Sequence, residues 1–173
     1  MTRLLNARGY SLASIVFHWL TAALVIVLFL THEREFIGLH VSLGAIAGLF
    51  LLYRVWWRWN RGFSRPADQP VLLNVLARLV VWGFLLAIVV TIVTGYLLPW
   101  SGGRDLVIFE ALRIPSPFAG NGAFHELMEE AHDIAGHAFL PLLALHVLGA
   151  LKHAFVDKDS VLLRMARPVE GGK

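Results

Sequence analysis

The sequence alternates long apolar runs with shorter polar connections. The apolar runs occupy about residues 14–31, 38–57, 77–98 and 132–154 and contain few charged side chains. A helix of about 20 apolar residues crosses a hydrocarbon core of about 30 Å, and each run is close to that length. The pattern predicts an all-α membrane protein, a four-helix transmembrane bundle that forms a single integral membrane domain over residues 1–173.

The first run follows the basic residues Arg3 and Arg8, an arrangement that also occurs in signal peptides. The run is longer than the apolar part of a signal peptide, and it lacks a small-x-small cleavage site. We therefore expect it to remain in the protein as the first spanning helix.

The composition supports a membrane protein and restricts its chemistry. Hydrophobic residues make up 57% of the chain and the mean hydropathy is +0.66, which is more apolar than an ordinary soluble protein. The chain has no cysteine, and this excludes disulfides, thiolate metal sites, iron–sulfur clusters and covalent attachment of a c-type haem. A metal ion or haem would have to be held by histidine, methionine or oxygen ligands.

The net charge of +3 is distributed unevenly over the predicted connections. Twelve of the fifteen lysines and arginines lie on one side of the predicted membrane, and only Arg34, Arg104 and Arg113 lie on the other. By the positive-inside rule both termini are cytoplasmic, and in a bacterium the chain would lie in the inner (plasma) membrane. The basic residues form neither a tail nor a soluble helix face, so we expect no nucleic-acid partner.

Six of the eight histidines fall inside the predicted spans, and four of these form the clearest pattern. His132 and His146 are fourteen residues apart, so on one helix they differ by about 40° in direction and by about 21 Å along the axis. His40 lies early in the second span, near the outer face, and His18 lies early in the first span, near the inner face. Because neighbouring spans are antiparallel, His40 is level with His132 and His18 with His146. Two histidine pairs at two depths indicate two b-type haems, each bound by two imidazoles inside the bundle.

A small residue follows each of these histidines by four positions. The four residues are Ala22, Gly44, Gly136 and Ala150. Residues four apart share a helix face, so these positions would leave room for a flat porphyrin beside its ligand. Gly48 would extend this clearance on the second helix. The alternative is that small residues simply allow close packing of membrane helices.

Arg54 follows His40 by fourteen residues and should face the same interior at the depth of His18 and His146. A guanidinium binds carboxylates well, so Arg54 is a candidate to anchor a propionate of the inner haem. The alternative is that Arg54 extends to the cytoplasmic boundary of the membrane.

The remaining histidines have weaker patterns. His153 follows His146 by seven residues, about 10 Å closer to the cytoplasm, where it could donate a hydrogen bond or a proton to a quinone or could be a plain interfacial histidine. His137 points about 140° away from His132, and we expect it to pack or to bond between helices. His32 and His125 fall in the outer connections and are predicted to be surface histidines, with a zinc site as the alternative.

The long outer connection, about residues 100–128, is rich in glycine and proline. It contains an amphipathic segment at residues 105–112. We expect this segment to lie flat at the membrane interface.

These features resemble the bacterial cytochrome b561 family of di-haem membrane proteins. The resemblance covers nearly the whole chain and is carried by Tyr10-Ser11-Leu12 before His18-Trp19, by His40-Val41-Ser42-Leu43-Gly44 with Arg54, by the spacing of His132 and His146, and by the closing residues 151–159 and 163–165. It implies that His18, His40, His132 and His146 are the axial ligands of two haem b groups. It also implies that His153 lies beside the inner haem and serves quinone use.

Some members of this family are similar to superoxide oxidases, which take an electron from superoxide on the outer side and reduce ubiquinone. The chain departs from the family at Val81, near Arg78, where members often carry a histidine that is not a ligand. It also has an acidic outer face, which would repel superoxide and favour a basic partner. The acidic residues are Glu33, Glu35, Asp105, Glu110, Glu126, Glu129, Glu130 and Asp133.

The sequence therefore predicts a transmembrane electron-transfer protein, most specifically an oxidoreductase of the superoxide:quinone type with ubiquinone as electron acceptor. The alternative is a cytochrome b membrane anchor that relays electrons between quinone and a partner dehydrogenase or c-type cytochrome. A third reading is a transporter or structural bundle without haem, in which the histidines are polar contacts or a proton path. Membrane lipid is a partner in every case.

Overall fold

The computed structural model describes residues 10–61 and 69–166. Four long helices make up most of this part of the chain: α1 (Leu12–Leu30), α2 (Ile37–Arg61), α3 (Val71–Ser101) and α4 (Gly122–Phe155). All four are long and apolar enough to cross a membrane. Short 3-10 helices, η2 (Arg34–Phe36) and η3 (Leu163–Met165), and the strands β1 (Leu106–Ile108) and β2 (Leu112–Ile114) complete the fold. The predicted all-α membrane bundle is confirmed.

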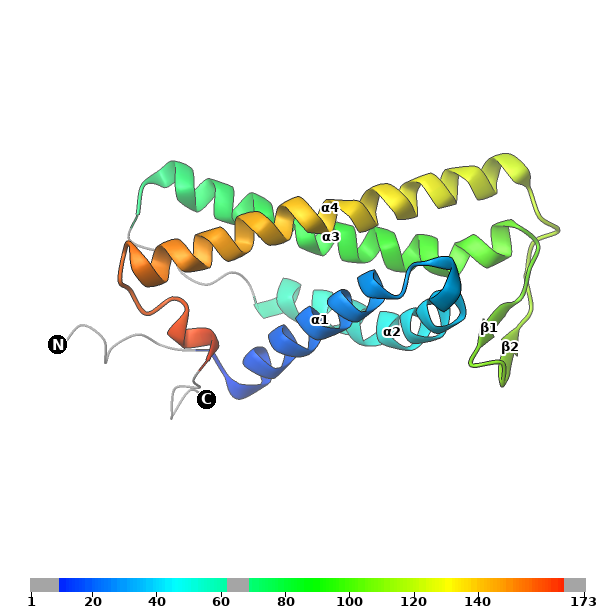
Figure 1. Ribbon diagram of the computed structural model, residues 1–173, viewed down its shortest axis with the longest axis horizontal. Helices are drawn as coiled ribbons and strands as arrows, with labels where there is room; N and C mark the ends of the chain where they lie inside the picture. The colour runs from blue at the N-terminus through cyan, green and yellow to red at the C-terminus, as the bar shows by residue number, and fades with distance from the viewer. Residues whose placement is uncertain (1–9, 62–68, 167–173) are drawn as a thin grey trace.

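The helices run along the long axis of the molecule (Figure 1). The strands lie at one end, which we call the hairpin end, and α1 begins and α4 ends at the other, which we call the terminal end. Helix α3 packs along α4 and also against α2, and α2 packs on α1. In the part of the chain that the structure describes, no comparable backbone packing joins α4 to α1 or α2. Side chains therefore bridge the space between α4 and these two helices.

The buried core lies where α2, α3 and α4 meet. It consists of Ala47, Leu51, Ala87, Ile88, Ile92 and Phe139. Many large apolar side chains remain exposed on the outward faces of the helices, among them Ile26, Leu49, Leu86 and Leu148. Such faces suit contact with lipid rather than with water.

Helix α4 begins ten residues earlier than the predicted span. The side chain of Asn121 accepts a hydrogen bond from the Phe124 N–H at 3.0 Å and so caps the helix. The added turns carry Glu126, Glu129 and Glu130, which lie outside the apolar run but do not oppose helix formation. The apolar run thus marked the spanning part of the helix and not its start.

The amphipathic segment at residues 105–112 is part of a β-hairpin packed on the bundle, and its place at the membrane interface stays a prediction. Strands β1 and β2 pair antiparallel, with Leu106 opposite Ile114. The turn places Phe109 and Glu110 at positive φ, and the Phe109 N–H donates to Ser42 Oγ on α2 at 2.8 Å. Leu106 is only 2% exposed, so the hairpin is held onto the bundle by burial and by this hydrogen bond.

At the terminal end the indole of Trp19 donates a hydrogen bond to the Met165 carbonyl at 2.8 Å. This bond ties the first half of α1 to η3, which follows α4. The two ends of the described chain are thereby joined on the same side of the bundle.

Candidate functional site

The structure brings four histidines of the spanning helices together in two pairs at two depths. The ring centroids of His40 and His132 are 6.1 Å apart at an interplanar angle of 83°. Those of His18 and His146 are 6.0 Å apart at 51°. We call these the hairpin-end pair and the terminal-end pair. Each pair joins α4 to a helix, α1 or α2, with which it shares no extensive backbone packing in the described part of the chain.

The separation within each pair fits two imidazoles on one metal ion. Imidazole rings with centres about 6 Å apart leave room between them for one metal ion that both would hold. Both pairs match this value. Paired imidazoles in an apolar bundle fit a b-type haem, whose iron each pair would hold.

Hydrogen bonds orient both rings of the hairpin-end pair. His40 Nδ1 donates to the Leu28 carbonyl oxygen at 2.8 Å, since a carbonyl can only accept. His132 Nδ1 lies 3.0 Å from Thr94 Oγ1, whose own proton goes to the Val90 carbonyl at 2.7 Å. The hydroxyl oxygen is therefore the acceptor and Nδ1 carries the proton. In both rings Nε2 keeps its lone pair for a metal ion.

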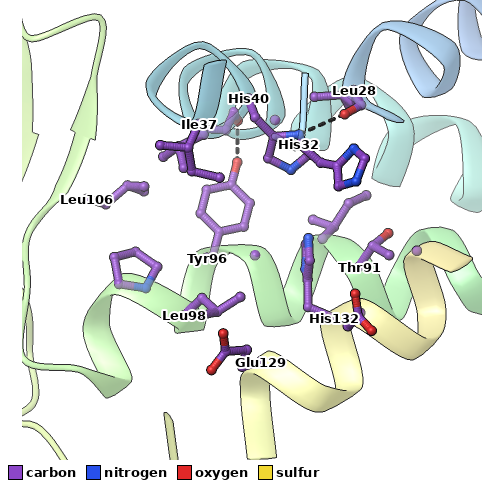
Figure 2. A pocket seen from close by; sticks show the side chains of 18 of the residues that line it. Leu28, His32, Ile37, His40, Thr91, Tyr96, Leu98, Leu106, Glu129 and His132 are labelled. Atoms are coloured by element: carbon purple, nitrogen blue, oxygen red, sulfur yellow. Dashed lines mark hydrogen bonds between the residues drawn. The ribbon is translucent and has the colours of Figure 1, made fainter. Parts of the chain in front are cut away.

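A cavity of about 610 Å³ surrounds the hairpin-end pair (Figure 2). Gly44 and Gly136 line it. No side chain or neighbouring helix comes within 4 Å of the place where a Cβ on Gly136 would stand, and on Gly44 it would meet only Leu28, at 3.7 Å. Both glycines thus open space beside a histidine, as a flat macrocycle requires.

Gly48 has a different role from the one predicted. A Cβ there would lie 3.3 Å from Ile92 and from Tyr96, so Gly48 permits the close approach of α2 to α3. The hydroxyl of Tyr96 donates to the Ala45 carbonyl at the same contact. The prediction that Gly48 extends the clearance beside His40 is wrong, because this face of α2 is turned toward a helix.

Arg54 lies at the terminal-end pair, as its spacing predicts. Its half-buried guanidinium is close enough to His18 and His146 to interact electrostatically with both. Phe84 lies 5.8 Å from His146 and 5.9 Å from Phe139, measured between ring centroids. Aromatic side chains thus occupy the bundle next to this pair, on the side toward the core.

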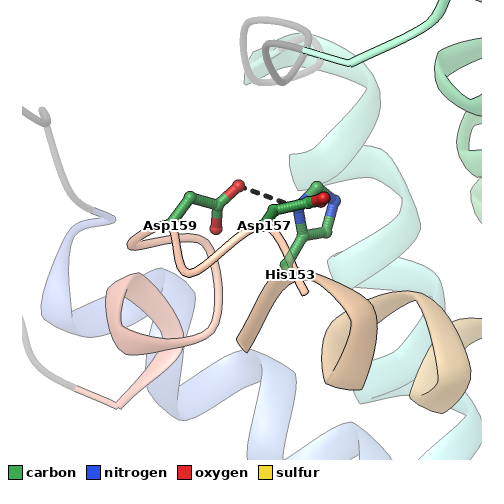
Figure 3. A group of neighbouring side chains, drawn as sticks. All are labelled: His153, Asp157 and Asp159. Carbon is green, nitrogen blue, oxygen red and sulfur yellow. Dashed lines mark hydrogen bonds and ion pairs between the residues drawn. The ribbon is translucent and has the colours of Figure 1, made fainter. Parts of the chain in front are cut away.

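His153 lies at the terminal end in a charged cluster (Figure 3). Its Nδ1 is 2.8 Å from Asp159 Oδ2 and 3.0 Å from Asp157 Oδ2. The ammonium of Lys152 is 2.5 Å from the same oxygen of Asp157. The imidazole of His153 and the carboxylates of Asp157 and Asp159 could hold a metal ion, since their ligand atoms lie within 4.8 Å of one another. The ammonium of Lys152, however, already neutralises Asp157. The geometry is that of an imidazole whose Nδ1 proton is held by carboxylates.

The other three histidines take separate positions. His125 is half-buried in α4, and its Nδ1 contacts Ser101 Oγ at 3.0 Å and the Leu98 carbonyl at 3.1 Å. The prediction of a surface histidine is wrong here, because α4 begins before this residue and packs it on the end of α3. His32 is exposed, and it lines the mouth of the cavity. His137 contacts the Asp133 backbone and carboxylate within its own helix, at 3.0 and 3.1 Å.

Sequence reasoning missed Thr94, Gly95 and the Leu28 carbonyl. A Cβ on Gly95 would stand 3.2 Å from His132 Cε1, so this glycine makes room for the ring that Thr94 orients. The adjacent residues Thr94 and Gly95 in the otherwise apolar third span were the sequence feature that could have indicated a contact with a histidine. The Leu28 carbonyl left no signal, because a backbone acceptor depends on position and not on residue type.

Four apolar helices with paired histidines inside them define a membrane protein of the cytochrome b class. A model of the prokaryotic cytochrome b561 family matches residues 9–168. The chain is also 28% identical over 174 residues to cytochrome b561 homolog 2 of Escherichia coli (strain K12), with 90% of each chain covered. The chain belongs to the prokaryotic cytochrome b561 family. It is a bacterial membrane protein of a family that binds haem b and transfers electrons across the membrane.

Proposed function

We propose that the chain carries electrons from a donor at the hairpin end to the quinone pool at the terminal end through two b haems. The observation that supports this most strongly is the pair of imidazole separations, 6.0 and 6.1 Å, at two depths of one bundle. Residues 1–173 would act as a single integral membrane domain. The positive-inside rule favours a bacterial inner membrane with both termini in the cytoplasm.

In this proposal the chain's own residues hold two irons. His40 and His132 would bind one, and His18 and His146 the other. When bound, the haems supply one-electron redox chemistry at a potential set by their surroundings. Two histidines on each iron leave no open coordination position, and this favours electron transfer over oxygen binding.

Arg54 would bind a propionate of the haem at the terminal-end pair. Its support is the half-buried guanidinium beside His18 and His146. A guanidinium in an apolar bundle needs a negative partner, and a haem carboxylate provides one with matching geometry.

His153 would serve ubiquinone, the proposed acceptor, at the terminal end. Reduction of a quinone to a quinol takes two electrons and two protons. The carboxylates of Asp159 and Asp157 hold the Nδ1 proton of His153, and Nε2 points away from them (Figure 3). An imidazole held in this way can donate a proton from Nε2 to a quinone oxygen and regain it from the cytoplasmic side.

The most specific form of the proposal has superoxide as the donor. Two superoxide ions would each lose one electron and become dioxygen, and one ubiquinone would take up the two electrons with two protons. Support comes from the family resemblance and from the cavity at the hairpin-end pair, whose lining includes exposed residues that a small reductant can reach.

A second candidate is a membrane anchor that exchanges electrons with a partner dehydrogenase or c-type cytochrome. The acidic residues Glu129 and Asp133 at the cavity mouth, with Glu126 and Glu130 nearby on α4, favour this form. A negative rim attracts a basic redox protein and repels an anion.

Both forms of the proposal require two b haems per chain. The reduced-minus-oxidised spectrum of the purified chain, with the ratio of haem to protein, tests this requirement. We expect two low-spin b haems per chain; one haem or none would contradict the pairing. Superoxide-dependent reduction of ubiquinone by the isolated chain would then select the first form. A redox subunit that co-purifies in equal amount, with no such activity, would select the second.

A further inference from the structure

Arg104 stands at the mouth of the cavity around His40 and His132. It follows the turn that ends α3, where the Gly103 N–H donates to the Trp100 carbonyl and the Arg104 N–H to the Pro99 carbonyl, both at 2.9 Å. Its side chain lines the cavity and is otherwise exposed. The position gives a cation direct access to whatever fills the cavity.

The turn that carries Arg104 is tightly packed. Gly103 has φ +70° and Gly120 has φ +87°, and they face each other so closely that a Cβ on Gly103 would stand 3.1 Å from the Ala119 carbonyl oxygen. The Asn121 N–H donates to the Ser101 carbonyl at 2.8 Å across the same contact. Glycine adopts these φ values without strain, and the close contact and the Asn121–Ser101 hydrogen bond restrain the backbone before Arg104. The guanidinium is presented from a fixed base.

Within residues 10–61 and 69–166, no salt bridge joins Arg104 to an acidic side chain. Among the described residues that line the cavity, Arg104 is the one lysine or arginine, and Asp105, Glu129 and Asp133 are the acidic ones. Asp105 accepts from the Ser116 N–H at 3.2 Å, and Asp133 contacts His137 at 3.1 Å. No carboxylate in the described part of the chain lies within ion-pair distance of Arg104. An unpaired guanidinium therefore borders a cavity that contains two orientated histidines.

We propose that Arg104 binds a propionate carboxylate of the haem held by His40 and His132. The inference rests on the proposed function and adds a residue to that site. A guanidinium matches a carboxylate with two parallel hydrogen bonds, each stronger than a neutral one. The acidic side chains at the rim would repel a propionate, and Arg104 is the group that offsets them.

The same guanidinium chemistry would suit a small free anion such as superoxide. The two sources differ in one measurable respect, because a propionate contact slows the release of haem and a substrate contact does not. Haem release is therefore the primary measurement, and it does not depend on enzyme activity.

The experiment uses the full chain in detergent, loaded with haem, and excess apomyoglobin as haem scavenger. R104Q removes the positive charge, and R104K keeps the charge but lacks the planar guanidinium. R113Q is the control, because Arg113 carries the same charge on β2, away from the cavity. Release of the two haems should give two kinetic phases. The phase that disappears in the His40→Ala variant is the one that belongs to the haem of the hairpin-end pair. We expect R104Q to release this haem about tenfold faster or more, as for loss of a hydrogen bond to a charged group. R104K should be intermediate and R113Q unchanged, with the other haem unaffected throughout.

Release from R104Q at the wild-type rate would overturn the assignment and leave the two-haem proposal standing. If R104Q keeps its haem but reacts more slowly with superoxide, Arg104 binds the substrate and the propionate assignment is wrong. Wild-type protein without haem at His40 and His132 would instead refute the proposed function. If R104Q does not assemble, the haem-release rates of R104K and R113Q are compared instead. Equal rates in these two variants would overturn the proposal.

Discussion

The Nδ1 atom of His132 on α4 lies 3.0 Å from the hydroxyl oxygen of Thr94 on α3. Helix α3 supplies no histidine of its own, yet it sets the tautomer and direction of a proposed ligand. The hydroxyl can accept because its proton is donated to the Val90 carbonyl within α3. Helix α3 therefore acts as the support of the hairpin-end pair.

Replacing Thr94 with valine should weaken haem binding at the hairpin-end pair by about 10–100-fold, the usual effect of losing a hydrogen bond to a ligating histidine. Haem titration of the apo-protein measures this. Thr91→Val is the matched control, because Thr91 lines the same cavity and its hydroxyl, among the described residues, bonds to the Ala87 and Ile88 carbonyls of its own helix and to neither histidine. Equal loss in both variants would show that the effect is one of helix packing.

Replacing His146 with alanine should remove the haem of the terminal-end pair and leave the other, so the haem content falls from two to one. His40→Ala should remove the other haem. The reason is that each pair lies at its own depth and shares no ligand. Haem content and the separate redox titrations of the two centres measure the outcome. Equal loss of both centres in either variant would contradict the depth assignment.

Gly136 and Gly149 offer a matched test of the space beside the hairpin-end pair. Both are glycines of α4, and at both a Cβ would have no atom of another element within 4 Å, but only Gly136 lines the cavity. Gly136→Val should fold normally and lose haem at His40 and His132, whereas Gly149→Val should keep it. Helical circular dichroism and haem content together separate folding from binding. Full haem content in Gly136→Val would mean that the macrocycle does not occupy this space.

Asp159→Asn should slow quinone reduction severalfold while leaving the reduction of the haems unchanged. The substitution weakens the 2.8 Å contact that holds the Nδ1 proton of His153, and proton donation to the quinone depends on that imidazole. Rapid mixing with a quinone analogue measures the two steps separately. Lys158→Gln, an exposed neighbour in the same turn, is the control. A parallel slowing of haem reduction would assign Asp159 a structural role.

The sequence by itself determined the number of spanning helices, their approximate limits and the depth of each intramembrane histidine. These properties follow from local quantities: the length of an apolar run, a rise of about 1.5 Å per residue, and a turn of about 3.6 residues. The fourteen-residue spacing therefore placed His132 and His146 at two depths without knowledge of their neighbours. The absence of cysteine likewise restricted the chemistry from composition alone.

Only the tertiary structure decided which groups surround those histidines. Thr94, Gly95 and the Leu28 carbonyl meet the rings because helices distant in sequence pack at particular rotations. Gly48 faces α3 for the same reason, although its spacing from His40 matched the ligand face. The hairpin that follows Arg104 is held on the bundle by burial of Leu106 and by the hydrogen bond from the Phe109 N–H to Ser42, which joins residues far apart in the chain. Periodicity along one helix carries no information about such contacts, since they depend on the relative placement of elements.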